Sequence, residues 1–335
     1  MPKKQRLRNY VSLSHGPDRD HTMNPQEKTR QIQQWAARLG LQGCGVSAAA
    51  PLPAEGVRLQ QWLQQGRQAG MDYMARHTDL RSDITVLVPG AISVISVCCN
   101  GRPHLEQLPG RPVIASYAFG EDYHRVMKDK LFTLKKWMED AWGPVNGRIF
   151  TDSAPVFEKM WAARSGLGFI GRHTLLTHPG CGSRLFLGEL VCDVTLAPTP
   201  PADPAVLERG ALCGTCRKCI EACPTGALSD EGLDARRCLS YLTIEHRAPL
   251  NVPLHHHLFG CECCQNACPH NRQVPFTSEP RFEGSPEAVN LTQEAWASLT
   301  PEDFERLWGH TPLKRAGLDQ LKRNLQAAFP ADTAQ

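Results

Sequence analysis

The spacing of apolar residues predicts four helices in the first half of the chain. The first begins after Asn24, which stands at the N-cap position before Pro25, and ends at Gly40. Apolar residues at helical spacing predict another helix around residues 59–63 and a long amphipathic one over 122–141. A shorter helix is predicted over 155–165, so much of this region is helical.

Short apolar runs rich in β-branched residues lie between these helices and predict strands. The expected strands cover residues 84–88, 91–99, 113–118, 174–176 and 185–194, with a further strand that ends at Phe150. Because helices and strands alternate along the chain, residues 24–204 are expected to form one α/β domain.

Three further regions differ from this domain in composition. Residues 1–23 are polar and basic without periodicity, and we expect a disordered extension. A proline-rich boundary over 197–204 separates the α/β domain from a cysteine-rich region over 205–275. Residues 276–335 are predicted to form a helical C-terminal segment, with helices over 286–299, 301–308 and 313–329.

The overall composition is that of an ordinary globular protein. Of 335 residues, 41% are hydrophobic and 21% charged, and a net charge of +3 is too small to indicate nucleic-acid binding by itself. No apolar signal-peptide core follows the basic N-terminus, and no run of about 20 apolar residues could span a membrane. We therefore expect a cytoplasmic protein that does not contact membranes.

The 14 cysteines are too many for a chain of this length unless the thiols have a special use. A disulfide scaffold is the ordinary alternative, but such scaffolds are short, secreted and rich in loops. In a reducing cytoplasm, thiols are kept for metal binding, which is the interpretation that we favour.

Two cysteine runs carry the strongest chemical signal of the sequence. In the first, Cys213, Cys216 and Cys219 are spaced by two residues, and Cys223 follows before a proline. This is the run by which bacterial ferredoxins bind iron–sulfur clusters. A shorter second run ends at Cys268, again before a proline. A zinc site with four cysteines also uses paired cysteines, but it does not require this longer run.

The ligand count closes at two 4Fe–4S clusters. In two-cluster ferredoxins the cysteine before the proline ligates the other cluster. Applied here, the rule gives two sets of four thiols: Cys213, Cys216, Cys219 and Cys268 for one cluster, and Cys223, Cys238, Cys261 and Cys264 for the other. Cys238 is included because the second run lacks one cysteine, and Cys264 is preferred to its neighbour Cys263 because it reproduces the spacing of the first run.

Apart from Cys263, the remaining cysteines are expected to be packing residues rather than nucleophiles, because their neighbours in the sequence are apolar. They are Cys44, Cys98, Cys99, Cys181 and Cys192.

The segment Gly166–Gly171 matches the G-x-G-x-x-G pattern of dinucleotide-binding proteins. That fingerprint requires a strand before it and a helix after it. Here the predicted order is the reverse, which argues against a Rossmann site, although three glycines would still let the backbone approach a large cofactor closely.

Asp152 is the most interesting candidate acid outside the cysteine region. It follows the strand that ends at Phe150, and open α/β sheets bind ligands at such strand ends. The residues alone favour an ordinary N-cap for the helix predicted from Pro155. His124 is similarly open to two interpretations, as a ligand or as a helix-surface residue, and the run 255–257 of three histidines is either an exposed loop or close to a cluster.

Several segments together resemble the epoxyqueuosine reductase family, whose cobalamin-dependent members complete the queuosine modification of tRNA. Besides the cysteine runs, the segments are 120–124 (GEDYH), 152–159 (DSAPVFEK), 166–176 (GLGFIGRHTLL), 186–189 (FLGE) and 238–245 (CLSYLTIE). The resemblance covers about residues 24–275. It departs from the family pattern at Glu262, Cys263 and His270, and the chain stops where many relatives continue into helical repeats.

The resemblance implies a fold, a reaction and a set of contacts. The fold would be an α/β N-terminal cobalamin-binding domain, like that of nitroreductases and dehalogenases, followed by a two-cluster ferredoxin-like module and the helical segment. The clusters would reduce cobalamin, the reacting cofactor, and Asp152 would act as proton donor, which now outweighs the N-cap interpretation. Burial beside the cofactor would keep its carboxyl group protonated. The implied cobalamin contacts are Arg76, Asp152, Gly171, Thr174, Leu187 and Gly188.

The partners implied by the resemblance are a tRNA that carries epoxyqueuosine and an unidentified low-potential electron donor. Basic residues near the cysteine runs are the expected phosphate contacts, namely Arg172, Lys218, Arg237 and Arg247. We expect a monomer. Two alternatives stay open: a cobalamin-dependent reductive dehalogenase, which would carry a twin-arginine export signal that is absent here, and a plain ferredoxin-type electron carrier.

Overall fold

A four-stranded antiparallel sheet forms the centre of the N-terminal domain. The computed structural model describes residues 23–250 and 252–330, so residues 1–22 of the predicted disordered extension lie outside the described range. The strands, in spatial order, are β1 (Gly43–Ala48), β2 (Ser93–Asn100), β7 (Leu185–Cys192) and β4 (Gly147–Phe150). All neighbours are antiparallel. The rule that places ligands at the strand ends of parallel sheets therefore does not apply to Asp152.

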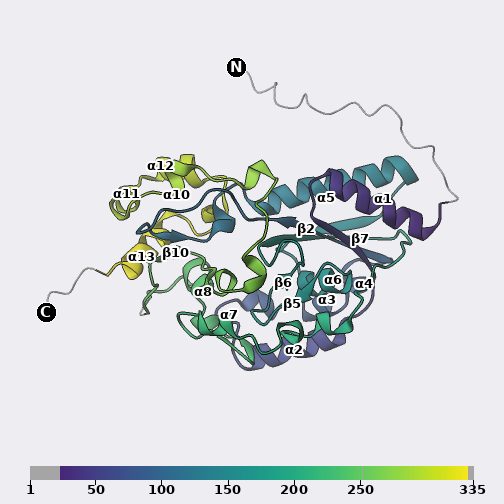
Figure 1. Cartoon of the computed structure of the whole chain (residues 1–335), viewed down its shortest axis with the longest axis horizontal. Coiled ribbons are helices and arrows are strands. Elements are labelled where there is room, and N and C mark those ends of the chain that lie inside the picture. Colours follow the sequence, from purple (N-terminus) through teal and green to yellow (C-terminus); the bar gives the residue numbers. More distant parts are fainter. Residues whose placement is uncertain (1–22, 251, 331–335) are drawn as a thin grey trace, which may run out of the picture.

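Helices cover both faces of this sheet (Figure 1). Helices α1 (Pro25–Arg38) and α5 (Tyr123–Trp142) pack on one face, and α6 (Glu158–Arg164) packs on the other. Side chains alternate between the faces along each strand. The sequence predicted α1 and α5 correctly, and Asn24 caps α1 by accepting a hydrogen bond from the Glu27 amide at 2.9 Å.

Three short helices lie beyond this layer, and one of them corrects a prediction. They are α2 (Pro53–Gln64), α3 (Thr78–Ser82) and α4 (Ile84–Leu87). The apolar run 84–88 was expected to be a strand, but Asp83 caps it as a helix by accepting from the Thr85 amide at 2.9 Å. Ile84 and Leu87 then face the core.

Three other elements are shorter than predicted. The expected strand over 113–118 contains only β3 (Val113–Ile114), after which the chain enters a 3-10 turn. The helix expected from Pro155 begins three residues later, at the start of α6. The strand expected over 174–176 is β6 (Leu176–Thr177), which forms a small hairpin with β5 (Phe169–Ile170).

The cysteine-rich module consists of short elements joined by loops. Its helices and strands are α7 (Lys218–Glu221), β8 (Leu228–Ser229), β9 (Gly232–Leu233), α8 (Leu239–Ile244), β10 (His257–Phe259) and α9 (Cys263–Asn266). Strand β10 pairs in parallel with β3 of the preceding domain. This pairing attaches the module to the N-terminal domain.

The C-terminal segment packs on that two-stranded junction. It contains α10 (Pro286–Val289), α11 (Gln293–Ser298), α12 (Pro301–Trp308) and α13 (Leu318–Ala328). The single helix expected over 286–299 is interrupted because Thr292 caps α11, and that expected over 313–329 is interrupted at Gly317, where φ is 79°. Buried Trp296 and Trp308 stack at 5.6 Å within the same core cluster as Phe259. Within the described ranges, no helix has the length and apolar character needed to cross a membrane.

Candidate active site

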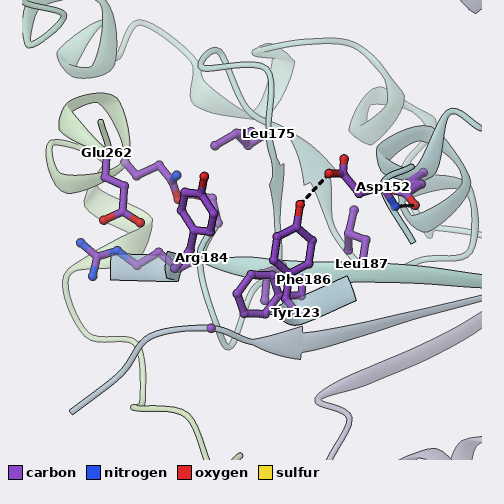
Figure 2. A pocket seen from close by; sticks show the side chains of 13 residues that line it. Tyr123, Asp152, Leu175, Arg184, Phe186, Leu187 and Glu262 are labelled. Carbon is purple, nitrogen blue, oxygen red and sulfur yellow. Dashed lines mark hydrogen bonds between the residues drawn. The ribbon is translucent and has the colours of Figure 1, made fainter. Parts of the chain in front are cut away.

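A pocket of about 220 Å³ lies between the N-terminal domain and the cysteine-rich module (Figure 2). Tyr123 and Asp152 line it from the N-terminal domain, and Glu262 and Gln265 line it from the loop that carries the second cysteine run. Glu262 fixes this loop to the N-terminal domain, because its carboxylate accepts hydrogen bonds from the amide of Ser116 at 2.9 Å and its hydroxyl at 3.1 Å. The pocket thus joins the candidate acid to the cysteine module.

Asp152 lies in a loop directly after β4 and has a left-handed φ of 58°. Its carboxylate oxygen Oδ2 accepts a hydrogen bond from the Tyr123 hydroxyl at 2.6 Å, and the same oxygen lies 3.2 Å from His124 Nε2. The amide of Asp152 donates to the Glu158 carboxylate. The N-cap interpretation is wrong, since the N-cap residue of α6 is Phe157 and Asp152 lies well upstream of the helix.

The charges around Asp152 keep its carboxyl group ionised. Burial alone would raise its pKa, but hydrogen bonds from His124 and Tyr123, together with the charges of His124 and Arg315, hold the pKa below its usual value. His124 lies between two carboxylates, with Nδ1 2.7 Å from Asp122 Oδ1. Burial opposes the charged imidazolium, yet these two acids raise the pKa of His124 to about 9. The expectation that burial keeps Asp152 protonated does not hold in this arrangement.

The thiols assigned to the first cluster lie near one another. Burial raises the pKa of Cys219, and the charges of Cys213 and Cys268 raise it further. The pKa of Cys268 is raised by burial and by Cys213 and Cys216. The backbone amide of Arg172 points at Cys213 Sγ, at 3.4 Å. Thiols from both cysteine runs therefore converge, as the exchange of ligands between the runs requires.

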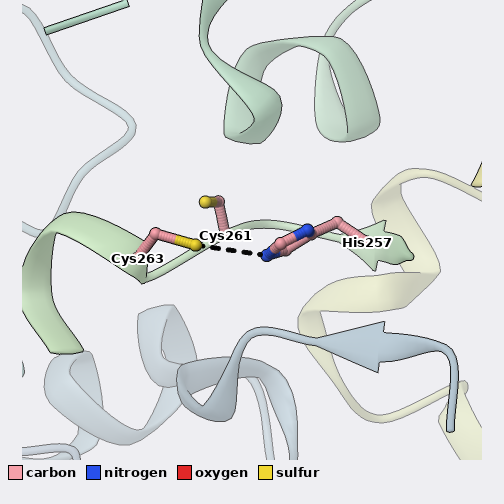
Figure 3. A group of neighbouring side chains, drawn as sticks. All are labelled: His257, Cys261 and Cys263. Atoms are coloured by element: carbon pink, nitrogen blue, oxygen red, sulfur yellow. Dashed lines mark hydrogen bonds between the residues drawn. The ribbon is translucent and has the colours of Figure 1, made fainter. Parts of the chain in front are cut away.

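The thiols of the second predicted set also lie near one another, and Cys264 points toward the others. Burial, followed by the charges of Cys238, Cys219 and Cys223, raises the pKa of Cys264 to about 12. Cys263 points elsewhere, toward His257 Nε2 at 3.6 Å, and these two residues form a close group with Cys261 (Figure 3). The arrangement supports Cys264 over Cys263 as the ligand. His257 is buried beside the module, whereas His255 and His256 are exposed.

The five cysteines predicted to be packing residues are inert in the structure. Cys98, Cys99, Cys181 and Cys192 are buried, and Cys44 is half-buried. Burial raises the pKa of Cys44 to about 12 and that of Cys192 to about 11. Such thiols are poor nucleophiles at neutral pH.

The glycine segment serves the packing of the chain itself. A Cβ atom at Gly168 would lie 2.3 Å from the Thr177 carbonyl oxygen, and one at Gly166 would lie 2.8 Å from that of Thr199. A helix precedes the segment and the β5–β6 hairpin follows, so the argument against a Rossmann site is confirmed.

The structure brings some of the predicted cofactor contacts to the pocket. Asp152 and Leu187 line it, and Thr174, with a left-handed φ of 72°, precedes the lining residue Leu175. Three others do not line this pocket, and their contacts with a cofactor stay predictions: Arg76, Gly171 and Gly188.

The predicted tRNA contacts fall into two groups. Lys218, Arg237 and Arg247 are exposed. Arg172 is largely engaged within the protein, since it donates to Asp230 Oδ1 at 2.9 Å and to the Gly214 carbonyl at 2.7 Å. Contact between Arg172 and a tRNA phosphate stays a prediction.

Several residues of the site were not predicted from the sequence. They are Tyr123, Glu158, Arg184, Glu189, Glu262 and Arg315. The segments 120–124, 152–159 and 186–189 contain three of them, so the resemblance pointed to their neighbourhood without giving their contacts.

Comparison with known families agrees with both halves of this site. Residues 81–153 match the family described as "Epoxyqueuosine reductase QueG, DUF1730", and residues 212–271 match the "4Fe-4S double cluster binding domain". The fold and site define an oxidoreductase that joins a two-cluster iron–sulfur module to an acid-lined pocket.

Individual relatives define the family more closely. The epoxyqueuosine reductase of Cellulophaga algicola is 40% identical over 90% of this chain and 99% of its own length. A solved epoxyqueuosine reductase in complex with a tRNA-Tyr epoxyqueuosine-modified stem loop aligns with a TM-score of 0.80 at 25% identity, covering 90% of this chain and 80% of that one. The Bacillus subtilis enzyme, solved with a catalytic aspartate loop swung out of the active site, aligns at 0.79 with the same identity and coverage. This chain belongs to the epoxyqueuosine reductase family.

Proposed function

We propose that this protein reduces epoxyqueuosine to queuosine within tRNA and releases the epoxide oxygen as water. The observation that carries the proposal is the pocket whose one wall holds Asp152 and whose other wall is the loop between the cluster cysteines. Family membership supports the same reaction. A relative solved with an epoxyqueuosine-modified tRNA stem loop supports tRNA as the substrate.

Two 4Fe–4S clusters fit the cysteine module. We assign one to Cys213, Cys216, Cys219 and Cys268, and the other to Cys223, Cys238, Cys261 and Cys264. Their thiols lie near one another in two groups, which supports this assignment. Such clusters pass electrons one at a time, which suits a module that receives them from a low-potential donor.

The pocket walls also fit a corrin cofactor. A second hollow of about 350 Å³ shares Arg184 and Glu262 with the first, and Cys261 lines it. The lining of the first pocket combines aromatic and aliphatic side chains, among which Tyr123 and Phe186 stack at 4.6 Å, with polar side chains such as Glu262. An apolar macrocycle that carries amide groups matches such a surface. When bound, cobalamin supplies a strongly reducing and nucleophilic metal centre.

Asp152 is the proposed proton donor to the epoxide oxygen. Tyr123 and His124 orient its carboxylate, and His124 carries the proton that the pair can deliver. A relative from Bacillus subtilis, solved with its catalytic aspartate loop swung out of the active site, supports a loop aspartate as the acid.

The exposed cations Lys218, Arg237 and Arg247 are the proposed phosphate contacts of the tRNA. The modified base would be turned out of the anticodon loop to enter the pocket, as in other single-stranded RNA recognition. We place the reaction in the cytoplasm, with a monomeric protein and a separate electron donor.

The test is direct conversion of the substrate. The protein is purified anaerobically, loaded with clusters and cobalamin, reduced, and mixed with tRNA that contains epoxyqueuosine. Nucleosides are then analysed by mass spectrometry. Formation of queuosine is the expected result. A fully loaded, reduced protein that leaves epoxyqueuosine unchanged would refute the proposal.

A further inference from the structure

A buried carboxyl group with no obvious function lies in the middle of the central sheet. Glu189 on β7 is fully buried, and neither of its carboxylate oxygens has a hydrogen-bond partner of normal geometry among the described residues. Its cross-strand neighbours are Ser96 on β2 and Phe150 on β4. An isolated carboxylate in such a place is strongly unfavourable, so Glu189 is expected to be protonated or to share a proton.

Glu158 connects this buried acid to the pocket. It is the first residue of α6, it lines the pocket, and its carboxylate accepts a hydrogen bond from the Asp152 amide. Burial, and then the charge of Glu158, raise the pKa of Glu189 well above its usual value. Because α6 packs on β7, Glu158 at the pocket wall and the fully buried Glu189 are neighbours.

The charges around the pair favour a shared proton. Burial, followed by the negative charge of Asp152, raises the pKa of Glu158 to about 8. The other titratable groups that face it are Tyr123, His124, Lys159 and Arg81. Among residues 23–250 and 252–330, none of these cations forms an ion pair with either glutamate. A neutral carboxylic acid thus stands at the pocket wall at neutral pH.

The proposed reaction needs two protons. Two electrons, delivered through the clusters, and two protons convert the epoxide to an alkene and water. The first carbon–oxygen bond breaks as the oxygen takes one proton, and the second breaks as the resulting hydroxyl takes another and leaves as water. The pair of His124 and Asp152 can deliver one proton before it must be protonated again.

We propose that Glu158 donates the second proton, which it shares at rest with Glu189. This inference rests on the proposed function. Glu158 is then a second catalytic acid, and Glu189 is a positioning residue that keeps a proton on the pair.

The experiment measures single-turnover conversion against pH for wild type and for Glu158→Gln, Glu189→Gln and Glu158→Asp. Glu302→Gln, an exposed acid on α12, is the matched control. Glu158→Gln keeps the contact with the Asp152 amide but loses the acid, and its rate should fall about 100-fold or more. Glu158→Asp should restore part of the rate. Glu189→Gln removes a negative charge beside Glu158 and so lowers the pKa of Glu158. The decline of activity at alkaline pH should therefore move to lower pH.

The outcomes separate this inference from the proposed function. If wild type converts the substrate and Glu158→Gln has the same rate and pH profile as the control Glu302→Gln, the inference is overturned while the proposed function stands. A second contrary result has two parts: Glu158→Gln loses rate that Glu158→Asp does not restore, and the pH profile of Glu189→Gln equals that of wild type. Together these would show that the pair has only a structural role, which also overturns the inference. A loaded wild-type protein without any conversion would overturn both. Cluster absorbance and circular dichroism confirm that each variant is folded.

Discussion

His124 Nε2 lies 3.2 Å from Asp152 Oδ2, and through this contact the two residues can act together as one proton donor. Because Asp122 holds the other ring nitrogen, the imidazole is surrounded by negative charge and keeps its proton at neutral pH. Asp152 is correspondingly ionised. The proton available to the pocket is therefore stored on His124 and reaches the substrate through Asp152.

Replacing His124 should remove this stored proton. We expect His124→Gln to lower kcat by about 100-fold, at the lower end of the usual range for general acid catalysis, and to leave KM for tRNA unchanged. In wild type, His124 is charged below its pKa of about 9, so its contribution disappears as pH rises through that value. Steady-state rates across pH test this: the variant should lose the step near pH 9 and keep the decline near pH 8 that belongs to Glu158, and a variant that keeps the step near pH 9 would contradict the prediction.

The adjacent thiols Cys263 and Cys264 should differ sharply in their effect on the clusters. Cys264→Ala removes a proposed ligand and should reduce the iron content from about eight to about four atoms per chain. Cys263→Ala is the matched control and should retain both clusters, because its thiol faces His257. Iron and sulfide analysis with electron paramagnetic resonance measures the number of clusters in each variant. Loss of a cluster in Cys263→Ala, with both clusters kept in Cys264→Ala, would overturn the assignment.

The ion pair between Lys130 and Glu279 should contribute to stability. Lys130 Nζ lies 2.6 Å from Glu279 Oε2, and both side chains are about nine-tenths buried. Removing Lys130 leaves the buried Glu279 carboxylate with Arg281 as its remaining partner. Lys130→Met should therefore lower the free energy of unfolding by about 2 kcal/mol, below the ~3–5 kcal/mol of a fully uncompensated buried charge. Lys136→Met, which removes an exposed pair on the same helix, should have little effect. Equal thermal midpoints for the two variants would contradict this prediction.

The same pair gives a pH dependence whose direction is fixed. Burial would raise the pKa of Glu279, but hydrogen bonds from Arg281 and Lys130 lower it overall. The stabilisation is therefore complete above the unfolded-state pKa of Glu279 and is lost as pH falls through its lower folded-state pKa. Thermal unfolding from neutral to acidic pH should show a decline that is smaller in Glu279→Gln, and equal declines would argue against the pair as its source.

The sequence predicted those elements whose signals are local. Asn24 and the residues after it specify the start of α1 without help from the rest of the fold. Strand β1 was missed because Gly43–Ala48 is built from small residues and exists through its pairing with β2. The run 84–88 was predicted as a strand from its β-branched residues, but it forms the helix α4 because Asp83 caps its first turn. Glu158 and Glu189 meet only when α6 packs on β7, which no spacing in the chain reveals.

The cysteine spacing was informative for a similar reason. The first run predicts its ligands because three thiols lie on one short loop, and the exchange with Cys268 follows from the pseudo-symmetry of such modules. By contrast, the role of Asp152 could not be decided from its own surroundings, since an N-cap and a catalytic acid use the same residue types after a strand. Its hydrogen bonds with Tyr123 and His124 distinguish the two.

The most direct test of the account compares wild type with Asp152→Asn in a single turnover. Both proteins carry clusters and cobalamin, are fully reduced, and are mixed with excess epoxyqueuosine-containing tRNA. We predict that wild type forms queuosine while Asp152→Asn, with the same cofactor content and tRNA affinity, is slower by about 100-fold or more. Queuosine formation by Asp152→Asn at the wild-type rate would contradict the central claim that the proton for epoxide opening passes through Asp152.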